Sequence, residues 1–260
     1  MGKLRSLMYL WIMSGSPLRI LLTFSFVLIL NESGSAQASN SAVQESDSLS
    51  WYIEMKYGLD QELFNGIQYY KTNVQYKGNP YFPEDVFYNG SVTLRGTRYD
   101  NVLLKYDSYS QQLILKYTDF KDRINLLIIN SIHLDSFCLG THCFQKLSLS
   151  DDGVLFHQLI ESGPVSCYIY WRREIHSLNY DFQYTHEYSS PIGTYYIRYM
   201  GEFHPIANRK KLLGIFPEST QPEFKSYLRQ EHFRFRKAGP KEIQNLLNFI
   251  SSLIETSPQH

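Results

Sequence analysis

Residues 101–117 read NVLLKYDSYSQQLILKY and carry the clearest structural signal in the chain. Apolar and aromatic side chains recur at every second position on both sides of the polar stretch 107–110, which is typical of two antiparallel strands joined by a turn. One face of this hairpin is predicted to bury Val102, Leu104, Tyr106, Leu113, Leu115 and Tyr117. The pattern therefore predicts a β-hairpin that contributes one face to a core.

Similar short runs, separated by turn residues, continue through most of the chain. They occupy residues 86–94, 124–129, 144–149, 154–160, 165–171 and 194–200. Ile124–Ile129 is apolar on both faces and predicts a central strand. The 21 Tyr and 16 Phe agree with a strand-rich fold. We therefore predict a mainly β protein, an antiparallel meander, sandwich or barrel-like sheet, with two C-terminal α-helices.

The last forty residues change to a helical period. Thr220–Glu223 has the form of a capping box with a proline in the first turn, and Gly239-Pro240 opens a second helix. The apolar stripe of this second helix comprises Ile243, Leu246, Leu247, Ile250, Leu253 and Ile254. We expect a β-rich body over residues 51–218 and a helical tail over residues 219–257, docked on the body through this stripe.

The beginning of the chain has the layout of a secretory signal peptide. Basic residues precede the eleven-residue apolar run Ile20–Leu30, and Gly34 and Ala36 supply the small residues of a cleavage site. We expect residues 1–36 to be the signal and residues 37–50, which are small and polar, to be a flexible leader. An uncleaved signal that anchors the chain in a membrane stays open as an alternative. The predicted location is the periplasm, the outer envelope or the extracellular space.

Charge and motifs narrow the classes of function. Without residues 1–36 the chain has 22 basic and 24 acidic residues, which argues against a nucleic-acid partner because phosphates require a basic surface. The G-x-S-x-G, H-E-x-x-H, P-loop and G-x-G-x-x-G patterns do not occur in the sequence. An enzyme is therefore disfavoured, although a hydrolase with dispersed catalytic residues stays open, and no cofactor is expected.

The three cysteines suggest one bond. Cys138 and Cys143 flank a four-residue loop that contains Gly140, so they are a disulfide candidate in an exported chain. Cys167 alternates with apolar residues and is expected to be a buried free thiol. Cys138, His142 and Cys143, with His133 or His157, are the alternative as metal ligands, but a lone C-x4-C unit is a weak zinc pattern. We therefore expect no metal.

Tyrosines are the most suggestive feature for binding, because a tyrosine offers a large contact area with a polar tip. The candidates for an aromatic binding surface are Tyr168, Tyr170, Tyr195, Tyr196 and Tyr199. Tyr69, Tyr70, Tyr76 and Tyr81 also crowd the segment before the first predicted strand. The simpler explanation is that these are ordinary strand tyrosines of a sheet with one face toward solvent.

The order of several short segments resembles an exported, functionally uncharacterised group of β-rich proteins of Bacteroidota. The segments are Ala36-Gln37, Leu63–Gly66 with Tyr69 and Tyr70, Asn79–Phe82, Tyr99–Asp107, Arg209–Leu213 and Phe216-Pro217. The resemblance implies bacterial export and a strand-rich body with a helical end, and it implies no catalytic residues. We therefore expect a non-enzymatic envelope protein that acts by surface contacts with another envelope component. The alternative is a glycan-binding module that uses exposed tyrosines.

Overall fold

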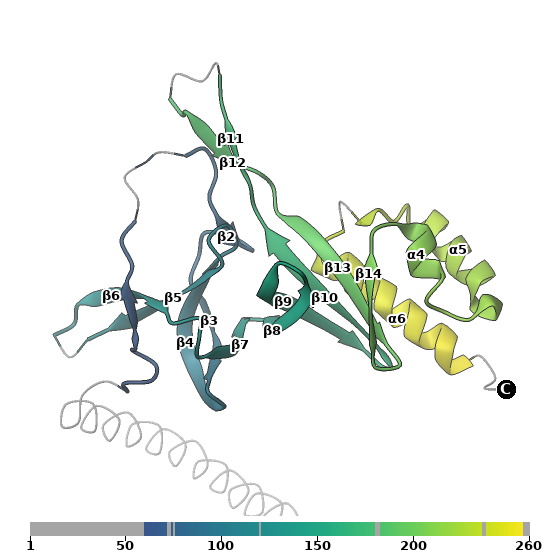
Figure 1. The fold of residues 1–260 in the computed structure, drawn as a ribbon, viewed down its shortest axis with the longest axis horizontal. Coiled ribbons are helices and arrows are strands. Elements are labelled where there is room, and N and C mark those ends of the chain that lie inside the picture. Colours follow the sequence, from purple (N-terminus) through teal and green to yellow (C-terminus); the bar gives the residue numbers. More distant parts are fainter. Residues whose placement is uncertain are drawn as a thin grey trace, which may run out of the picture. The chain divides into compact units, whose positions relative to one another are not determined.

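The computed structural model describes residues 60–256, except residues 72, 73, 75, 120, 180–182, 236 and 237 (Figure 1). These residues belong to the second of two compact units, Asp60–His260. The expected signal peptide, the leader and residues 51–59 of the expected body lie outside the described residues.

Fourteen strands occur in the described part of the chain. They are β1 (Gly66–Gln68), β2 (Tyr81–Phe82), β3 (Tyr88–Leu94), β4 (Thr97–Asp107), β5 (Gln112–Thr118), β6 (Ile124–Ile129), β7 (Leu134–Leu139), β8 (His142–Ser150), β9 (Gly153–Ser162), β10 (Val165–Arg172), β11 (Ile175–Ser177), β12 (His186–Tyr188), β13 (Ile192–Tyr199) and β14 (Glu202–Ile206).

Most of these strands form one antiparallel sheet. Its order is β1-β6-β5-β4-β3-β7-β8-β9-β10-β13-β14, with β2 paired to β4, and β11 and β12 form a separate hairpin. The path is open, because β1 and β14 end it without pairing to each other. The predicted antiparallel β fold with a meander order is confirmed, and the barrel-like alternative is not what forms.

The β4–β5 hairpin has the predicted register. Leu104 lies opposite Leu115 and Tyr106 lies opposite Leu113, and all four side chains are buried. The prediction for β6 is wrong in one respect, because this strand is one place from the edge of the sheet. Its outer neighbour is the three-residue strand β1, so the side chain of Ile124 is 65% exposed.

Three α-helices follow the sheet in the described residues: α4 (Arg209–Leu213), α5 (Gln221–Gln230, after the 3-10 turn Glu218–Thr220) and α6 (Pro240–Thr256). The Thr220 side chain does not cap α5, because its backbone is already helical (φ −86°, ψ −17°) rather than extended; its hydroxyl donates to the Pro217 carbonyl. α6 packs on β9 and β10 through Ile243, Leu246, Leu247, Ile250 and Leu253, which are all buried. Among the described residues, no helix is long and apolar enough to cross a membrane.

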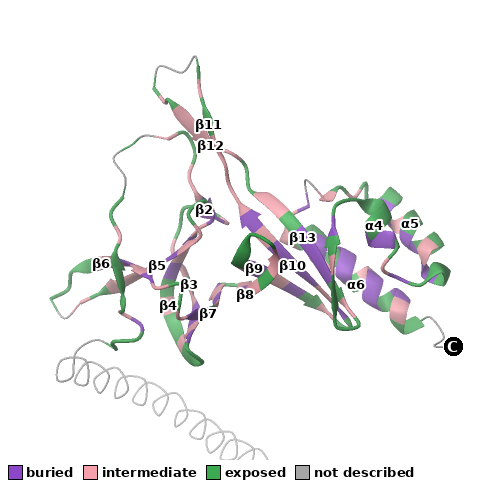
Figure 2. Cartoon of the chain, viewed as in Figure 1, coloured by how far each residue is buried: buried purple, intermediate pink, exposed green. Residues whose placement is uncertain are grey.

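The two faces of the sheet differ. One face, the core face, carries the stacked Phe137 and Phe144 rings, 4.7 Å apart, and continues under the helices. Figure 2 shows buried residues both on β10 and β13 and on α6. The opposite face, called here the outer face, presents Lys105, Ile114, Ile128 and Ile67, which lie opposite one another across β4, β5, β6 and β1. Because side chains alternate along a strand, residues two positions away share this face.

Candidate functional site

A cluster of five tyrosines brings distant segments together at one end of the outer face. Tyr69 follows β1, Tyr81 lies in β2, Tyr109 lies in the β4–β5 turn, and Tyr76 and Tyr188 link the following segment to β12. The five tyrosines together with Lys105, Asp107 and Arg173 are called the tyrosine site. Their rings range from buried Tyr81 to Tyr109, which is 48% exposed.

Tyr69 and Tyr81 form the inner part of the site. Their hydroxyl oxygens are 2.7 Å apart, so one phenol donates a hydrogen bond to the other. Burial, with this bond and the nearby acids adding to it, raises the pKa of Tyr81 well above its ordinary value. Tyr81 therefore stays neutral and acts as a hydrogen-bonding partner rather than as a base.

Lys105 is held beside Tyr81 by aromatic rings and one carboxylate. Its ammonium nitrogen lies 4.4 Å from the centres of both the Tyr81 and Phe87 rings and 2.6 Å from Asp85 Oδ1. The ring faces attract the cation, and the carboxylate neutralises it. Because its side chain is only 12% exposed, Lys105 serves mainly to position Tyr81 and Phe87.

Arg173 ties the end of β10 to β2 and to the segment after β12. Its guanidinium donates to the Ser189 carbonyl at 2.6 Å and to the Tyr81 carbonyl at 3.0 Å. Burial lowers the pKa of Arg173, and Asp107 opposes that shift. These bonds fix the base of the projecting β11–β12 hairpin against β2 (Figure 1).

The outer part of the site is aromatic and partly open to solvent. The Tyr188 ring centre lies 5.0 Å from that of Tyr76 and 5.6 Å from that of Tyr109. Burial and the charge of Asp107 raise the pKa of Tyr188 to about 12. The neighbouring residues Lys77 and Glu187 form an ion pair, with 3.4 Å between Nζ and Oε2, and alternation along the strand places it on the other face of the hairpin from the rings. The site therefore offers partly exposed aromatic rings with polar tips, which are groups suited to binding.

The sequence-predicted tyrosines lie elsewhere and on both faces of the sheet. Tyr168, Tyr170 and Tyr196 share the outer face of β10 and β13, whereas Tyr195 and Tyr199 lie on the core face. Tyr168, Tyr195 and Tyr196 are 4%, 5% and 7% exposed, so the expectation that they form an exposed surface is wrong.

Neighbouring rings and helices explain this burial. Tyr168 packs edge-on against Phe203, and Tyr196 packs against His157. Tyr195 donates its hydroxyl to the Ala238 carbonyl before α6, and Tyr199 contacts Phe216. Only Tyr170 and Tyr199 keep part of their side chains exposed.

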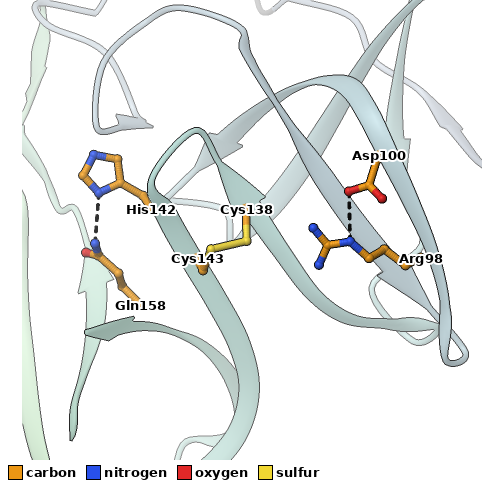
Figure 3. Close-up of a disulfide and its surroundings, with 6 residues drawn as sticks. All are labelled: Arg98, Asp100, Cys138, His142, Cys143 and Gln158. Atoms are coloured by element: carbon orange, nitrogen blue, oxygen red, sulfur yellow. Dashed lines mark hydrogen bonds and ion pairs between the residues drawn. A yellow bond between two sulfur atoms is a disulfide. The ribbon is translucent and has the colours of Figure 1, made fainter. Parts of the chain in front are cut away.

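The predicted Cys138–Cys143 disulfide is present. The two residues lie opposite each other in β7 and β8, with Cα atoms 4.0 Å apart. Their sulfurs are bonded to each other and so are not free as metal ligands. His142 points away from them toward the Gln158 amide, which donates to its Nδ1 at 3.0 Å (Figure 3). Gln158 in turn accepts from the Trp171 indole at 2.7 Å.

Cys167 is a buried free thiol, as predicted. Burial raises its pKa well above the ordinary value, which keeps the sulfur protonated and unreactive.

Tyr109 and Tyr188 were missed at the level of sequence. Tyr109 lies in the turn of the most clearly predicted hairpin, so its exposure could be predicted from the sequence. Its contact with Tyr188 could not. Tyr188 approaches Tyr109 only because the β11–β12 hairpin pairs with residue 77. A contact between positions so far apart leaves no periodic signal.

Comparison with known protein families, with characterised proteins and with solved structures finds no match to this chain. Function therefore has to be argued from the tyrosine site itself.

Proposed function

We propose that this chain is an exported, non-enzymatic envelope protein that binds another envelope protein through the tyrosine site. The observation that carries the proposal is the partly exposed ring group of Tyr76, Tyr109 and Tyr188, whose backbone is held by hydrogen bonds from Tyr188 N–H to the Lys77 carbonyl and from Tyr109 N–H to Asp107 Oδ1, both 2.9 Å. Partly open aromatic side chains on a fixed frame provide contact area without a large loss of side-chain entropy on binding.

The geometry favours a protein partner over a glycan. The ring planes of Tyr76 and Tyr188 meet at 47°, and those of Tyr109 and Tyr188 meet at 70°. A flat sugar ring stacks best on rings that share one plane, whereas the uneven surface of a protein fills an angled group.

Export is supported by two independent features. The beginning of the sequence has the layout of a signal peptide. The Cys138–Cys143 disulfide is the form expected in an oxidising compartment.

The test is chemical cross-linking in the intact envelope, followed by purification of the protein and mass spectrometry. We expect one reproducible protein partner, and we expect Tyr76→Ser with Tyr109→Ser to reduce its yield at least tenfold. The matched control is Met200→Ser, at a residue that is 84% exposed in another turn, and it should leave the yield unchanged. A partner retained by the tyrosine variant would contradict the proposal, and so would a glycan as the sole cross-linked species.

A further inference from the structure

The edge strand β1, which ends one residue before Tyr69 of the tyrosine site, is a second candidate contact. In the described part of the chain, β1 pairs only with β6. The Tyr69 N–H donates to the Leu126 carbonyl at 2.9 Å, and hydrogen-bonded pairs alternate in an antiparallel ladder. The backbone N–H and C=O of Gln68 therefore point to the open edge.

Apolar side chains lie beside this edge. Ile67 is 73% exposed and Ile124 is 65% exposed, and Leu126 and Ile128 lie half-buried between them on the same face. The other edge of the sheet, formed by β14, is less open to a further strand. β14 carries Pro205, which has no backbone donor, and α4 packs beside it.

The charges around the β1 edge are basic. Lys71 follows β1, and Lys116 lies opposite Leu126 on β5. Neither lysine forms an ion pair with any other described residue. Arg123 is already held by Asp119 at 2.8 Å. The surface therefore combines an open backbone edge, an apolar row and two lysines that form no ion pair with the other described residues, one of which, Lys116, lies on β5 with its ammonium 5.6 Å from the Phe87 ring centre.

We propose that β1 binds an extended segment of another protein, in which apolar residues alternate and acidic residues flank them. The segment adds a strand at Gln68, and its apolar side chains extend the row of Ile67 and Ile128. A second copy of this chain would bring like charges together. A lipid surface would leave the Gln68 backbone groups without partners. The proposed contacts use the Gln68 backbone, the apolar row and the two lysines rather than the rings of the tyrosine site, so they do not depend on the function proposed for that site.

The test uses a synthetic probe peptide in which three valines alternate with threonines between two pairs of glutamates. We expect the peptide to slow hydrogen exchange of the Gln68 amide at least tenfold, as measured by NMR on the protein. Gln68→Pro removes the outward N–H and should weaken binding at least tenfold. Gln68→Ala is the matched control, because it keeps the N–H, and it should bind within twofold of the unaltered protein.

A charge exchange tests the same proposal without altering the backbone. Lys71→Glu with Lys116→Glu should bind the lysine-flanked version of the peptide more tightly than the glutamate-flanked one. Three results would overturn the proposal: a Gln68 amide that the peptide does not protect, an amide already protected in the protein alone, or binding to anionic phosphatidylglycerol vesicles with no binding of peptide. Protection of that amide that rises with protein concentration would instead assign the edge to a second copy.

Discussion

At the scale of single residues, Gly90 shows how closely β3 and β7 approach. A Cβ atom at this position would collide with the Cys138 carbonyl oxygen. Gly90→Ala should therefore lower the free energy of unfolding by about 1–3 kcal/mol, because the strands would have to move apart. Gly214→Ala is the control, since its Cβ would meet the nearest atom at an ordinary 3.6 Å and its φ is −72°. Urea unfolding of both variants measures the difference, and equal stabilities would contradict this account.

A buried imidazole, that of His157, and a half-buried one, that of His142, predict how the free energy of unfolding depends on pH. Burial lowers the pKa of both His142 and His157 below the ordinary value of 6.5. Near pH 6 the unfolded chain therefore binds more protons than the folded chain. The free energy of unfolding consequently has its full value above pH 6.5 and decreases as the pH falls below it. The melting temperature should therefore decrease between pH 7.5 and pH 5.0.

The control for this prediction uses one buried and one exposed histidine. His157→Gln should reduce the slope of melting temperature against pH, whereas His176→Gln should not change it. Asp119 does not interfere, because its hydrogen bond from Arg123 lowers its pKa to about 2. A melting temperature that rises on acidification would contradict the assignment.

The tyrosines show what sequence reveals about single residues. Alternation correctly places Tyr168 and Tyr170 on one face of β10, because the period of a strand decides it. Alternation does not tell which face the helices cover. For this reason Tyr195, which the helical segment buries, looks the same in sequence as an exposed tyrosine.

At the scale of elements, α6 is the main cover of the later strands. Leu247 is fully buried in its apolar stripe. Leu247→Asp should lower the free energy of unfolding by at least about 3 kcal/mol, because it places a charge in the core. Asn248→Asp, at the neighbouring exposed position, should change it by no more than about 0.5 kcal/mol. Thermal unfolding of both variants, followed by circular dichroism, measures the difference. A Leu247→Asp variant as stable as the unaltered protein would mean that α6 is not needed for folding.

The disulfide joins β7 and β8 inside a hairpin that the ladder already holds. Its sequence separation is only 5, so a chain-entropy estimate gives about 2 kcal/mol of stability. Reduction should therefore lower the melting temperature without unfolding the protein at 25 °C. In mass spectrometry without reductant, the tryptic peptide of residues 124–146 should be two hydrogens lighter than the reduced form. Alkylation of both cysteines in unreduced protein would contradict the bond.

Long elements with a clear period were predictable from the sequence, and short ones were not. The β4–β5 hairpin and the stripe of α6 follow from alternation and from the helical period. β1, β2, β11 and β12 have two or three residues each, which is too few for a period. The apolar pattern of β6 indicated a central strand. The residues of β6 do not reveal that its outer neighbour, β1, has only three residues.

At the scale of the described unit, the outer face connects the two proposed contacts. Lys105 of the tyrosine site and Ile67 of β1 stand in the same row across four strands. The antiparallel β class was predictable, because it depends on the sum of many strand signals. The tyrosine site was not, because it depends on contacts between segments about a hundred residues apart.

Site-specific photo-cross-linking tests the central claim most directly. A photoreactive benzoylphenylalanine replaces Tyr109 in one variant and Lys225, an exposed residue of α5, in another. After irradiation of intact cells, position 109 should give one protein adduct of defined mass, and position 225 should not give it. The same adduct at both positions, or none at position 109, would contradict a role for the tyrosine site in binding.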